Sequence, residues 1–553
     1  MTTTIYRARK ILTMNPRRPE ATHVAVRDGR VLGTGALEDL AGWGDHELDD
    51  RFADRVIVPG FVEGHCHSWE GAAWEDTYLG FFDRTAPDGV VHKGLKSIDD
   101  VVERFRASEA RNSDPDRAAM GWGFDPIFFD GRRMVAADLD RVSAIRPVVV
   151  MHQSGHIVNV NSEVLRRAGI SRDTNVQGLV ADANGDPTGE LQGPALQAIA
   201  YRAAGKRRFL DMGDAGALRR FAHSALRAGV TTATDLANEL PEETVAGQVA
   251  ATAHEDFPLR VVPAFYAAAR PAAEGVEWVK SLIPRSHDRL RYGLVKLVAD
   301  GSIQGFTARM KWPGYYNGHE NGLWYIEPRE ELPCILGTYH RAGLQVHVHT
   351  NGDEATEAAI DAIEAVLREH PASDARFTLQ HCQMAHDAHF RRMARLGICA
   401  NLFANHIHYW GDQHVALTMG RERAERMDAA GSAKRLGVPF SIHSDAPVTH
   451  LAPLFTAWCA VNRFTASGRV LGPAERIPVE DALHAVTLGA AFTLKLDTEI
   501  GSLETGKRAD FAILEDDPLA VDPAALKDVA VWGTVVGGRV FPVSEIGAAG
   551  APE

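Results

Sequence analysis

The chain has 553 residues, of which 45% are hydrophobic and 24% are charged, as is usual for a globular protein. This length exceeds what one ordinary hydrophobic core supports, so we expect a barrel accompanied by additional domains. The net charge of −14 argues against nucleic acid or an anionic membrane surface as a partner, because phosphates would not be neutralised. A small-molecule substrate is the expected partner, and a homo-oligomer stays an open alternative.

Cysteine usage and the lack of long apolar segments predict the compartment. The five cysteines are widely spaced, odd in number and without a Cys-x-x-Cys pair, which favours a reducing compartment over a disulfide framework. Residues 1–10 contain no apolar core long enough for a signal peptide. A membrane helix would need an apolar run of about 18 residues, and we find none. A cytoplasmic protein is therefore expected.

Short β-rich runs occupy both ends of the chain. Residues 5–14, 22–27 and 30–34 are predicted to be strands, with Asp28-Gly29 as a hairpin signal. Residues 500–514, 529–536 and 539–541 have the same character. Taken alone, the first group predicts a small independent β domain.

A long segment separates the first apolar strand from the next convincing one. About 160 residues lie between His67 and the run 230–236, whereas a strand–helix unit needs only roughly 30. Most of this segment is therefore predicted to be an insertion, with a helix over 97–110 capped by Ser97, a strand over 147–151 and a short helix within 160–170. Its aromatic residues, from Trp69 to Phe129, either form its own core or line an apolar pocket.

The remainder alternates regularly between strands and helices. Apolar runs at 230–236, 259–267, 290–299, 344–349, 377–381, 398–402 and 439–442 are predicted strands, and 218–228 and 354–368 are predicted helices. This alternation indicates a parallel sheet.

Histidines and one aspartate follow several of these strands. His65 and His67 are two positions apart, so on a strand they point to the same side and can hold one metal ion. His349, His381 and Asp445 lie at or near the ends of later apolar runs. Ligands at the carboxyl ends of successive strands are what a metal site at the mouth of a β/α barrel requires.

With these motifs the chain resembles a metal-dependent hydrolase of the amidohydrolase superfamily, in the amidohydrolase-3 branch that includes YtcJ-like proteins and N-substituted formamide deformylases. The segments Gly506-Lys-Arg-Ala-Asp510, Ser154-Gly-His156 and 295–302 carry further parts of this resemblance. It implies a (β/α)8 TIM-type barrel over 58–494, a discontinuous β-sandwich domain from 1–57 and 495–545, and an insertion over 75–215. The insertion would overhang the barrel mouth and help to shape the substrate pocket.

The resemblance also implies a metal centre with a specific ligand set. His65, His67 and Asp445 would hold one divalent ion, and His349 and His381 would hold a second. Zinc is the expected metal, with one or two ions bound. His347 has the same strand parity as His349 but lies deeper, so it is predicted to be a hydrogen-bonded core residue.

Lys296 lies inside the apolar run 294–299, where an ammonium would lack an obvious partner. One interpretation is that Lys296 extends to the barrel rim or pairs with Asp300. An ammonium beside two dications would be repelled, however. In the superfamily a lysine on the fourth strand is often carbamylated and bridges two metals, and we favour that interpretation for Lys296.

The implied activity is hydrolysis of a carbon–nitrogen, amide-type bond of a small molecule by metal-activated water. Asp445 is expected to move the proton from water to the leaving group, and His156 to stabilise the oxyanion or to serve a structural role. His443 is expected to orient a ligand. A polar group near the seventh strand is expected to line the pocket: Asn401, Asn405, His406 and His408. A deaminase, esterase or decarboxylase using the same site, or a non-catalytic regulatory homologue, is the alternative.

Overall fold

The centre of the protein is a sheet of eight parallel strands that closes into a barrel. The computed structural model describes every residue except 1–2, 112–113, 115–116, 130, 207–213 and 547–553. The strands, in spatial order, are β5 (Phe61–Glu63), β14 (Val230–Asn238), β15 (Arg260–Tyr266), β16 (Leu294–Val298), β17 (Gln345–Thr350), β18 (Thr378–His381), β19 (Cys399–Leu402) and β20 (Phe440–Ile442). A parallel bridge between Cys66 and Ala446 joins the first strand's extension to the last.

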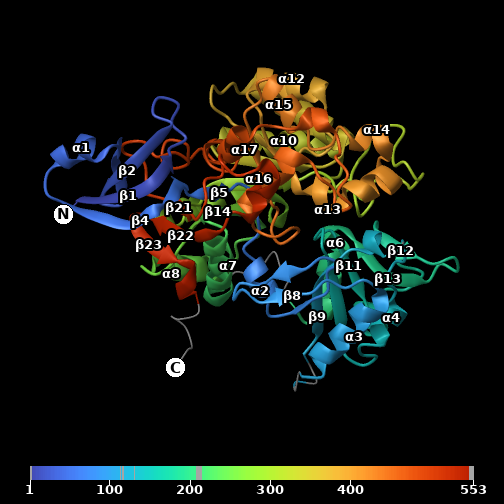
Figure 1. The fold of residues 1–553 in the computed structure, drawn as a ribbon. Coiled ribbons are helices and arrows are strands. Elements are labelled where there is room, and N and C mark those ends of the chain that lie inside the picture. The colour runs from blue at the N-terminus through green and yellow to red at the C-terminus, as the bar shows by residue number, and fades with distance from the viewer. Residues whose placement is uncertain (1–2, 112–113, 115–116, 130, 207–213, 547–553) are drawn as a thin grey trace.

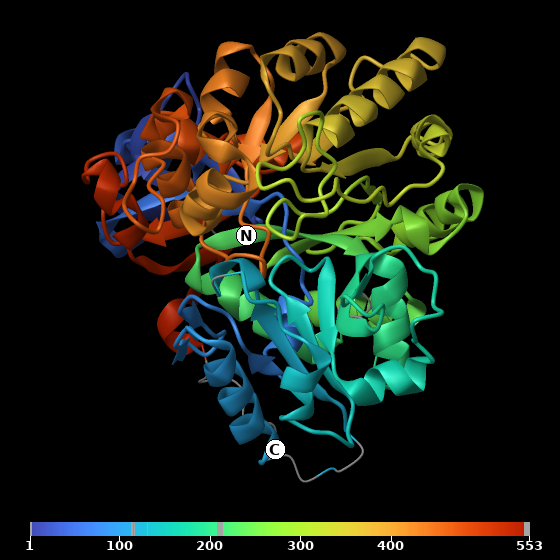
Figure 2. The same cartoon turned by 90° about the vertical axis from the view of Figure 1, so that its right-hand side faces the viewer.

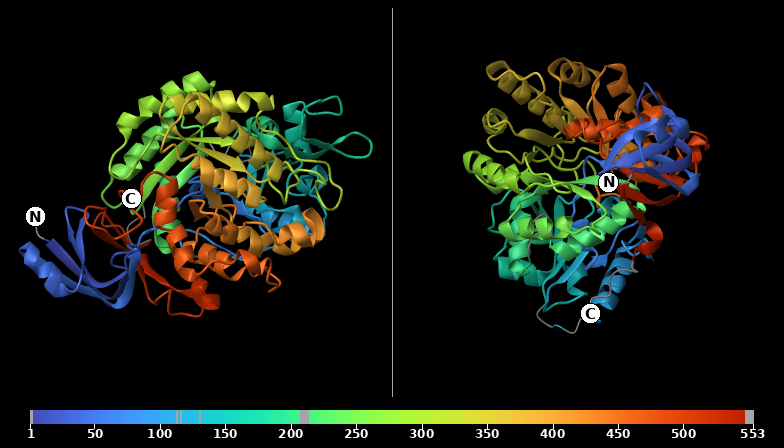
Figure 3. Two further views of the ribbon diagram at one scale, coloured as in Figure 1. Left: turned by 90° about the horizontal axis from the view of Figure 1, so that it is seen from above. Right: turned by 90° about the vertical axis from the view of Figure 1, so that its left-hand side faces the viewer.

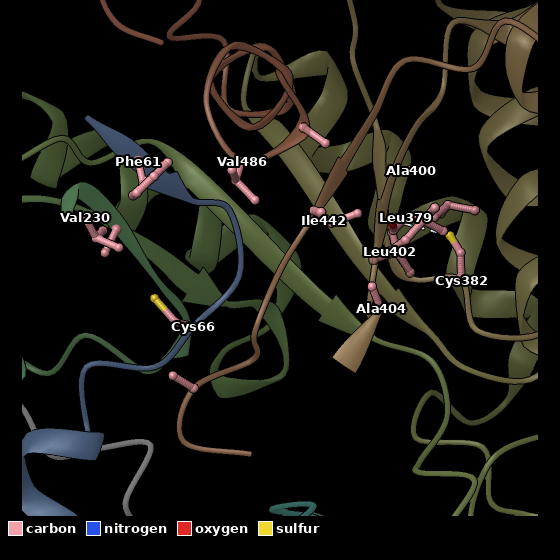
Figure 4. Close-up of a cluster of buried hydrophobic side chains, with 14 of the residues drawn as sticks. Phe61, Cys66, Val230, Leu379, Cys382, Ala400, Leu402, Ala404, Ile442 and Val486 are labelled. Carbon is pink, nitrogen blue, oxygen red and sulfur yellow. Dashed lines mark hydrogen bonds between the residues drawn. The ribbon is translucent and has the colours of Figure 1, made fainter. Parts of the chain in front are cut away.

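Helices connect and cover these strands. They are α7 (Ala215–Arg227), α8 (Glu242–Ala253), α9 (Ala272–Leu282), α10 (Leu332–Arg341), α11 (Asp353–Glu369), α12 (Asp387–Leu396), α13 (Asn405–Gln413), α14 (Gly420–Ala424), α15 (Ala430–Arg435), α16 (Pro453–Asn462), α17 (Val479–Ala485) and α18 (Leu488–Thr493). Barrel strands are buried on both faces, and strands such as β15 and β16 are accordingly rich in apolar residues. Figure 4 shows part of the resulting core, in which Phe61, Val230, Leu379 and Ile442 contribute side chains from well-separated parts of the chain.

Strands from the two chain ends form one further sheet. Its order is β23 (Arg539–Pro542), β22 (Val531–Val536), β21 (Phe511–Leu514), β4 (His46–Pro59), β1 (Thr3–Leu12), β2 (Glu20–Arg27) and β3 (Arg30–Gly35). The 14-residue strand β4 pairs with β1 on one side and β21 on the other. A buried ion pair fastens this sheet to the barrel, because the Arg260 guanidinium donates to both carboxylate oxygens of Asp510.

The segment between β5 and α7 folds as a separate layer with a six-stranded sheet. The order of its strands is β12 (Leu179–Ala181), β13 (Pro187–Gln192), β11 (Ile157–Val160), β10 (Val148–His152), β9 (Ala119–Phe124) and β6 (Thr77–Tyr78). Its main helices are α3 (Ile98–Glu109), α5 (Ser162–Ala168) and α6 (Gly193–Ala203). Ser97 caps α3 by accepting a hydrogen bond from the Asp100 amide at 3.0 Å.

The end sheet and the insertion lie on opposite sides of the barrel (Figures 1 and 3). The insertion packs directly against the barrel (Figure 2), and three side chains fasten it there. Arg84 donates to the carbonyl oxygens of Pro447 and Thr449, both at 2.9 Å, in the loop after β20. Gln153 donates to the Val448 carbonyl at 2.7 Å, and Asp125 accepts from the Trp410 indole at 3.0 Å. The insertion is therefore held against the loop that carries Asp445.

The predicted fold class, a (β/α)8 barrel with a β domain from both chain ends and a large insertion after the first strand, is confirmed. The predicted division at 1–57 with 495–545, 58–494 and 75–215 stays a proposal. Among the described residues no helix is long and apolar enough to cross a membrane.

Candidate metal centre

His65, His67 and Asp445 converge at the carboxyl-terminal mouth of the barrel. The Asp445 Oδ1 atom lies 3.3 Å from His65 Nε2 and 3.2 Å from His67 Nε2. Each residue offers one ligand atom, and these atoms lie within 4.8 Å of one another. Burial alone would raise the pKa of Asp445, but the neighbouring His67, His443 and Lys296 lower it below its usual value. The carboxylate is therefore ionised at neutral pH.

His349 and His381 lie beside this group, with ring centroids 4.5 Å apart, and the His381 ring is also 4.5 Å from the His65 ring. His381 Nδ1 is 3.8 Å from Asp445 Oδ2. His381 follows Gln380 on the strand, so simple alternation would point these two side chains to opposite faces. A φ of 71° at His381 breaks the alternation and allows both to face the interior.

Burial lowers the pKa of His65, His349 and His381 well below the ordinary value. These imidazoles are therefore neutral at pH 7, which is the form that binds a metal ion. His349 Nε2 lies 3.2 Å from the Gly301 carbonyl. The side-chain nitrogen of Asn351, a donor, lies at the same distance of 3.2 Å from Nε2, so this nitrogen faces both an acceptor and a donor.

A chain of hydrogen bonds fixes the tautomer of His65. His347 Nε2 lies 3.0 Å from the Thr493 carbonyl and must donate to it, so His347 Nδ1 accepts from the Gln380 amide at 2.7 Å. The Gln380 carbonyl oxygen then accepts from His65 Nδ1 at 2.7 Å. The lone pair of His65 is consequently on Nε2, the nitrogen that faces Asp445.

Glu63 joins the loops that carry His65 and Asp445. Its Oε1 accepts from the amides of His65 at 3.3 Å and Ser444 at 3.2 Å, and its Oε2 accepts from the Ser444 hydroxyl at 2.8 Å. Asp445 itself has a φ of 53°, and its amide donates to the His65 carbonyl at 3.0 Å. These contacts hold Asp445 in an uncommon backbone conformation.

Lys296 on β16 is buried, and its Nζ has no hydrogen-bond partner among the described residues. Burial lowers its pKa to about 7. The alternative that Lys296 pairs with Asp300 finds no support, because that carboxylate instead accepts from the amides of Arg309, Asn351 and Gly352. An unpartnered buried amine is costly and calls for a further group at this position.

The predicted ligands fit a divalent cation. In the described part of the chain, both His381 nitrogens, Asp445 Oδ1 and Lys296 Nζ are buried without a hydrogen-bond partner. Neutral imidazoles and a carboxylate are ligands that zinc and similar ions accept. A cation among these groups would satisfy the polar atoms that are otherwise left unpaired.

A cavity of about 100 Å³ opens onto these residues. The predicted ligands His65, His67, Lys296, His349, His381 and Asp445 all line it, together with His156 from the insertion. The His156 ring is 5.1 Å from the His349 ring and 5.6 Å from the Tyr325 ring. Burial lowers the pKa of His156 to about 4, so it is a neutral hydrogen-bonding group at the cavity wall.

His347 is hydrogen-bonded below the centre, as expected. His443 lies next to the predicted ligands. One of its ring nitrogens is within 4.8 Å of ligand atoms of His65 and His381, so it could bind a metal ion as well as orient a ligand. Both His443 nitrogens are buried without a partner in the described chain.

The prediction that the polar group near β19 lines the pocket is wrong. Asn401, Asn405, His406 and His408 are absent from the described lining. Asn401 instead donates to Gln380, Asn405 to Thr449, and His406 pairs with His414. Asn401 therefore lies beside Gln380 inside the barrel, whereas His406 lies in α13 beside His414. Residues close to a strand end in sequence need not face the mouth.

Gln380 and Glu63 were not predicted from the sequence. Gln380 could have been found because it is a polar residue within the buried strand Thr378-Leu-Gln-His381. The aromatic residues Tyr201, Tyr266 and Tyr325, which also line the cavity, come from three separate segments and have no common sequence signal.

The amidohydrolase family matches residues 53–542 of the chain. The putative amidohydrolase YtcJ of Bacillus subtilis (strain 168) is 27% identical over 544 residues, which cover 96% of this chain and 97% of that protein. The N-substituted formamide deformylase of Arthrobacter pascens is 25% identical over 544 residues, covering 96% of each.

The crystal structure of an uncharacterized metal-dependent hydrolase from Pyrococcus horikoshii OT3 has the same fold, with a TM-score of 0.71 at 21% identity. The alignment covers 94% of this chain and 99% of that structure. The family match spans most of the sequence, including every predicted ligand. The chain therefore belongs to the amidohydrolase family, a family of hydrolases.

Proposed function

We propose that the protein is a metal-dependent amidohydrolase that cleaves the carbon–nitrogen bond of a small, amide-type substrate. The observation that carries this proposal is the convergence of the His65, His67 and Asp445 ligand atoms at the edge of a cavity. The family match supports hydrolysis, and a relative named as a formamide deformylase supports an amide-type bond.

His65, His67 and Asp445 would hold one divalent ion, with zinc as the proposed metal, and His349 and His381 would hold a second. Lys296 would bridge them as a carbamate, which would place an anion where the structure has an unpartnered buried amine. A divalent ion in such a site polarises a carbonyl and makes water a nucleophile at neutral pH.

Asp445 is the proposed proton carrier. Its Oδ1 faces His65 and His67, which leaves Oδ2 to take a proton from the attacking water and to return it to the leaving nitrogen. Because its pKa is lowered, the carboxylate is unprotonated when the reaction begins. His156, on the opposite wall, would donate a hydrogen bond to the substrate carbonyl oxygen as negative charge develops there.

The test combines metal analysis with product analysis. We expect purified protein to contain a divalent metal and to release amine and acid from N-formyl or N-acyl amines. We expect His65→Ala to contain less metal and to release neither product. Release of ammonia from a cyclic amidine would instead identify a deaminase. Release of an alcohol from an ester would identify an esterase, and release of CO₂ from an acid would identify a decarboxylase. Metal-loaded protein that turns over none of these compounds would contradict an enzymatic function.

We also propose a cytoplasmic location, in keeping with five unpaired cysteines.

A further inference from the structure

The insertion supplies the wall of the cavity that faces the metal centre. Met151 and the turn from Ser154 to His156 follow β10, while Pro194, Gln197 and Tyr201 come from α6. Arg84 and Gln153 hold the insertion, and with it this wall, against the loop after β20.

The cavity contains very few charged side chains. Among the described residues that line it, Asp445 and Lys296 are the only ones of the Asp, Glu, Lys and Arg types. Both belong to the proposed metal centre, and Lys296 as a carbamate would add negative rather than positive charge. The rest of the described lining is apolar, aromatic, hydroxyl, amide or imidazole.

This composition determines which substituents the wall can accommodate. An apolar chain on the substrate nitrogen would bury its surface against Met151, Tyr201 and Val448, which favours binding. A carboxylate in the same position would lose its hydration without meeting a guanidinium or ammonium group, and a buried charge without a partner is strongly disfavoured.

We infer that the site takes uncharged amides with an apolar substituent on nitrogen and rejects amides that carry a carboxylate beside that nitrogen. This inference rests on the proposed function. Amides with a short, unbranched alkyl chain on nitrogen present such a substituent and are suitable probes.

Three matched compounds test the inference: N-butylformamide, N-formylnorvaline and N-formylnorvalinamide. The second adds a carboxylate to the first, and the third replaces this carboxylate by a neutral carboxamide of the same shape. We expect metal-loaded enzyme to hydrolyse both neutral compounds, with kcat/KM at least a hundredfold higher for the carboxamide than for the carboxylate. A carboxylate turned over within tenfold of the carboxamide would overturn the inference while leaving amide hydrolysis intact.

A variant of the wall tests the cause directly. Gln197 is 8% exposed and its amide donates to the Gly155 carbonyl at 2.9 Å. Gln197→Arg adds a cation to the wall, and Gln197→Met is its control because it replaces the amide by an unbranched side chain without charge. We expect the carboxylate-to-carboxamide ratio of kcat/KM to rise at least tenfold in Gln197→Arg relative to Gln197→Met.

An unchanged ratio would show that the missing counter-charge does not cause the selectivity, and would refute the inference. If none of the compounds is hydrolysed, the proposed function fails, and binding to the metal-loaded Gln197 variants decides the inference separately. Tighter binding of N-formylnorvaline by Gln197→Arg than by Gln197→Met, with equal binding of the carboxamide, supports it. Equal binding of both compounds by the two variants contradicts it.

Discussion

Replacing Asp445 by asparagine separates metal binding from proton transfer. The Oδ1 atom lies 3.3 Å and 3.2 Å from the Nε2 atoms of His65 and His67, and an asparagine amide oxygen can occupy that position. Its amide nitrogen then replaces Oδ2 and cannot accept a proton. We therefore expect Asp445→Asn to fold and to retain at least one metal ion while losing the proton carrier.

The expected loss follows from the role of the second oxygen. Groups that move protons contribute roughly 10²–10⁴-fold to enzymatic rates, which corresponds to about 3–5 kcal/mol of activation free energy. We expect kcat on a neutral formamide to fall at least about a hundredfold. Turnover and metal content are measured on the same preparation, the metal by mass spectrometry.

Asp428→Asn is the matched control, since Asp428 is a buried carboxylate that is absent from the described cavity lining. This control is expected to keep its kcat. If Asp445→Asn retains metal and more than about a tenth of wild-type activity, Asp445 is not the proton carrier, and the base must be sought at His156 or His443.

Four further expectations follow from the same geometry. His65→Ala and His67→Ala should each lower metal content and abolish activity with an unchanged circular dichroism spectrum, and full metal occupancy in either would contradict the ligand assignment. Lys296 should be carbamylated, so the NMR spectrum of protein reconstituted with ¹³C-bicarbonate should show a carbamate carbon signal that is absent from Lys296→Met. Identical NMR spectra of the two proteins would favour a single-metal enzyme. Gln380→Leu removes the acceptor that fixes the His65 tautomer, so chelator competition should show weaker metal binding than in wild type. Gln380→Glu keeps an acceptor and should bind metal more nearly as wild type does. Equal metal affinity in wild type and both variants would refute this role. Burial raises the pKa of Asp125 to about 7, against roughly 3.9 in an unfolded chain. The folded chain therefore holds a proton that the unfolded chain has lost, so stability falls as the pH rises from about 4 to about 7, and urea melts of Asp125→Asn should show a flatter dependence.

The sequence by itself determined the secondary structure of the barrel and the order of its strands. Runs such as 259–267 are mostly apolar because strands of a parallel barrel are buried on both faces. His65 and His67 were predictable as a pair because strand geometry alone points positions i and i+2 to the same side. The deeper position of His347 followed from the same rule, and its hydrogen bonds to Thr493 and Gln380 agree with it.

Only the tertiary structure decided how the remaining groups face the centre. Strand parity places Gln380 and His381 on opposite faces, and a left-handed φ at His381 brings both inside. That conformation depends on packing around β18 and has no local sequence signal. The prediction that Asn401 and His406 line the pocket was wrong for a similar reason. Asn401 lies beside Gln380 inside the barrel and His406 lies in α13, and proximity to a strand end specifies neither position.

The composition of the cavity wall also required the folded chain. Met151, Gln197 and Tyr201 lie far in sequence from Tyr266, Tyr325 and Val448, yet all line one cavity. Nothing in the local sequence distinguishes them from ordinary core residues, because each is apolar or neutral. Their shared function arises when Arg84 and Gln153 fasten the insertion to the loop after β20, a contact between segments some 300 residues or more apart.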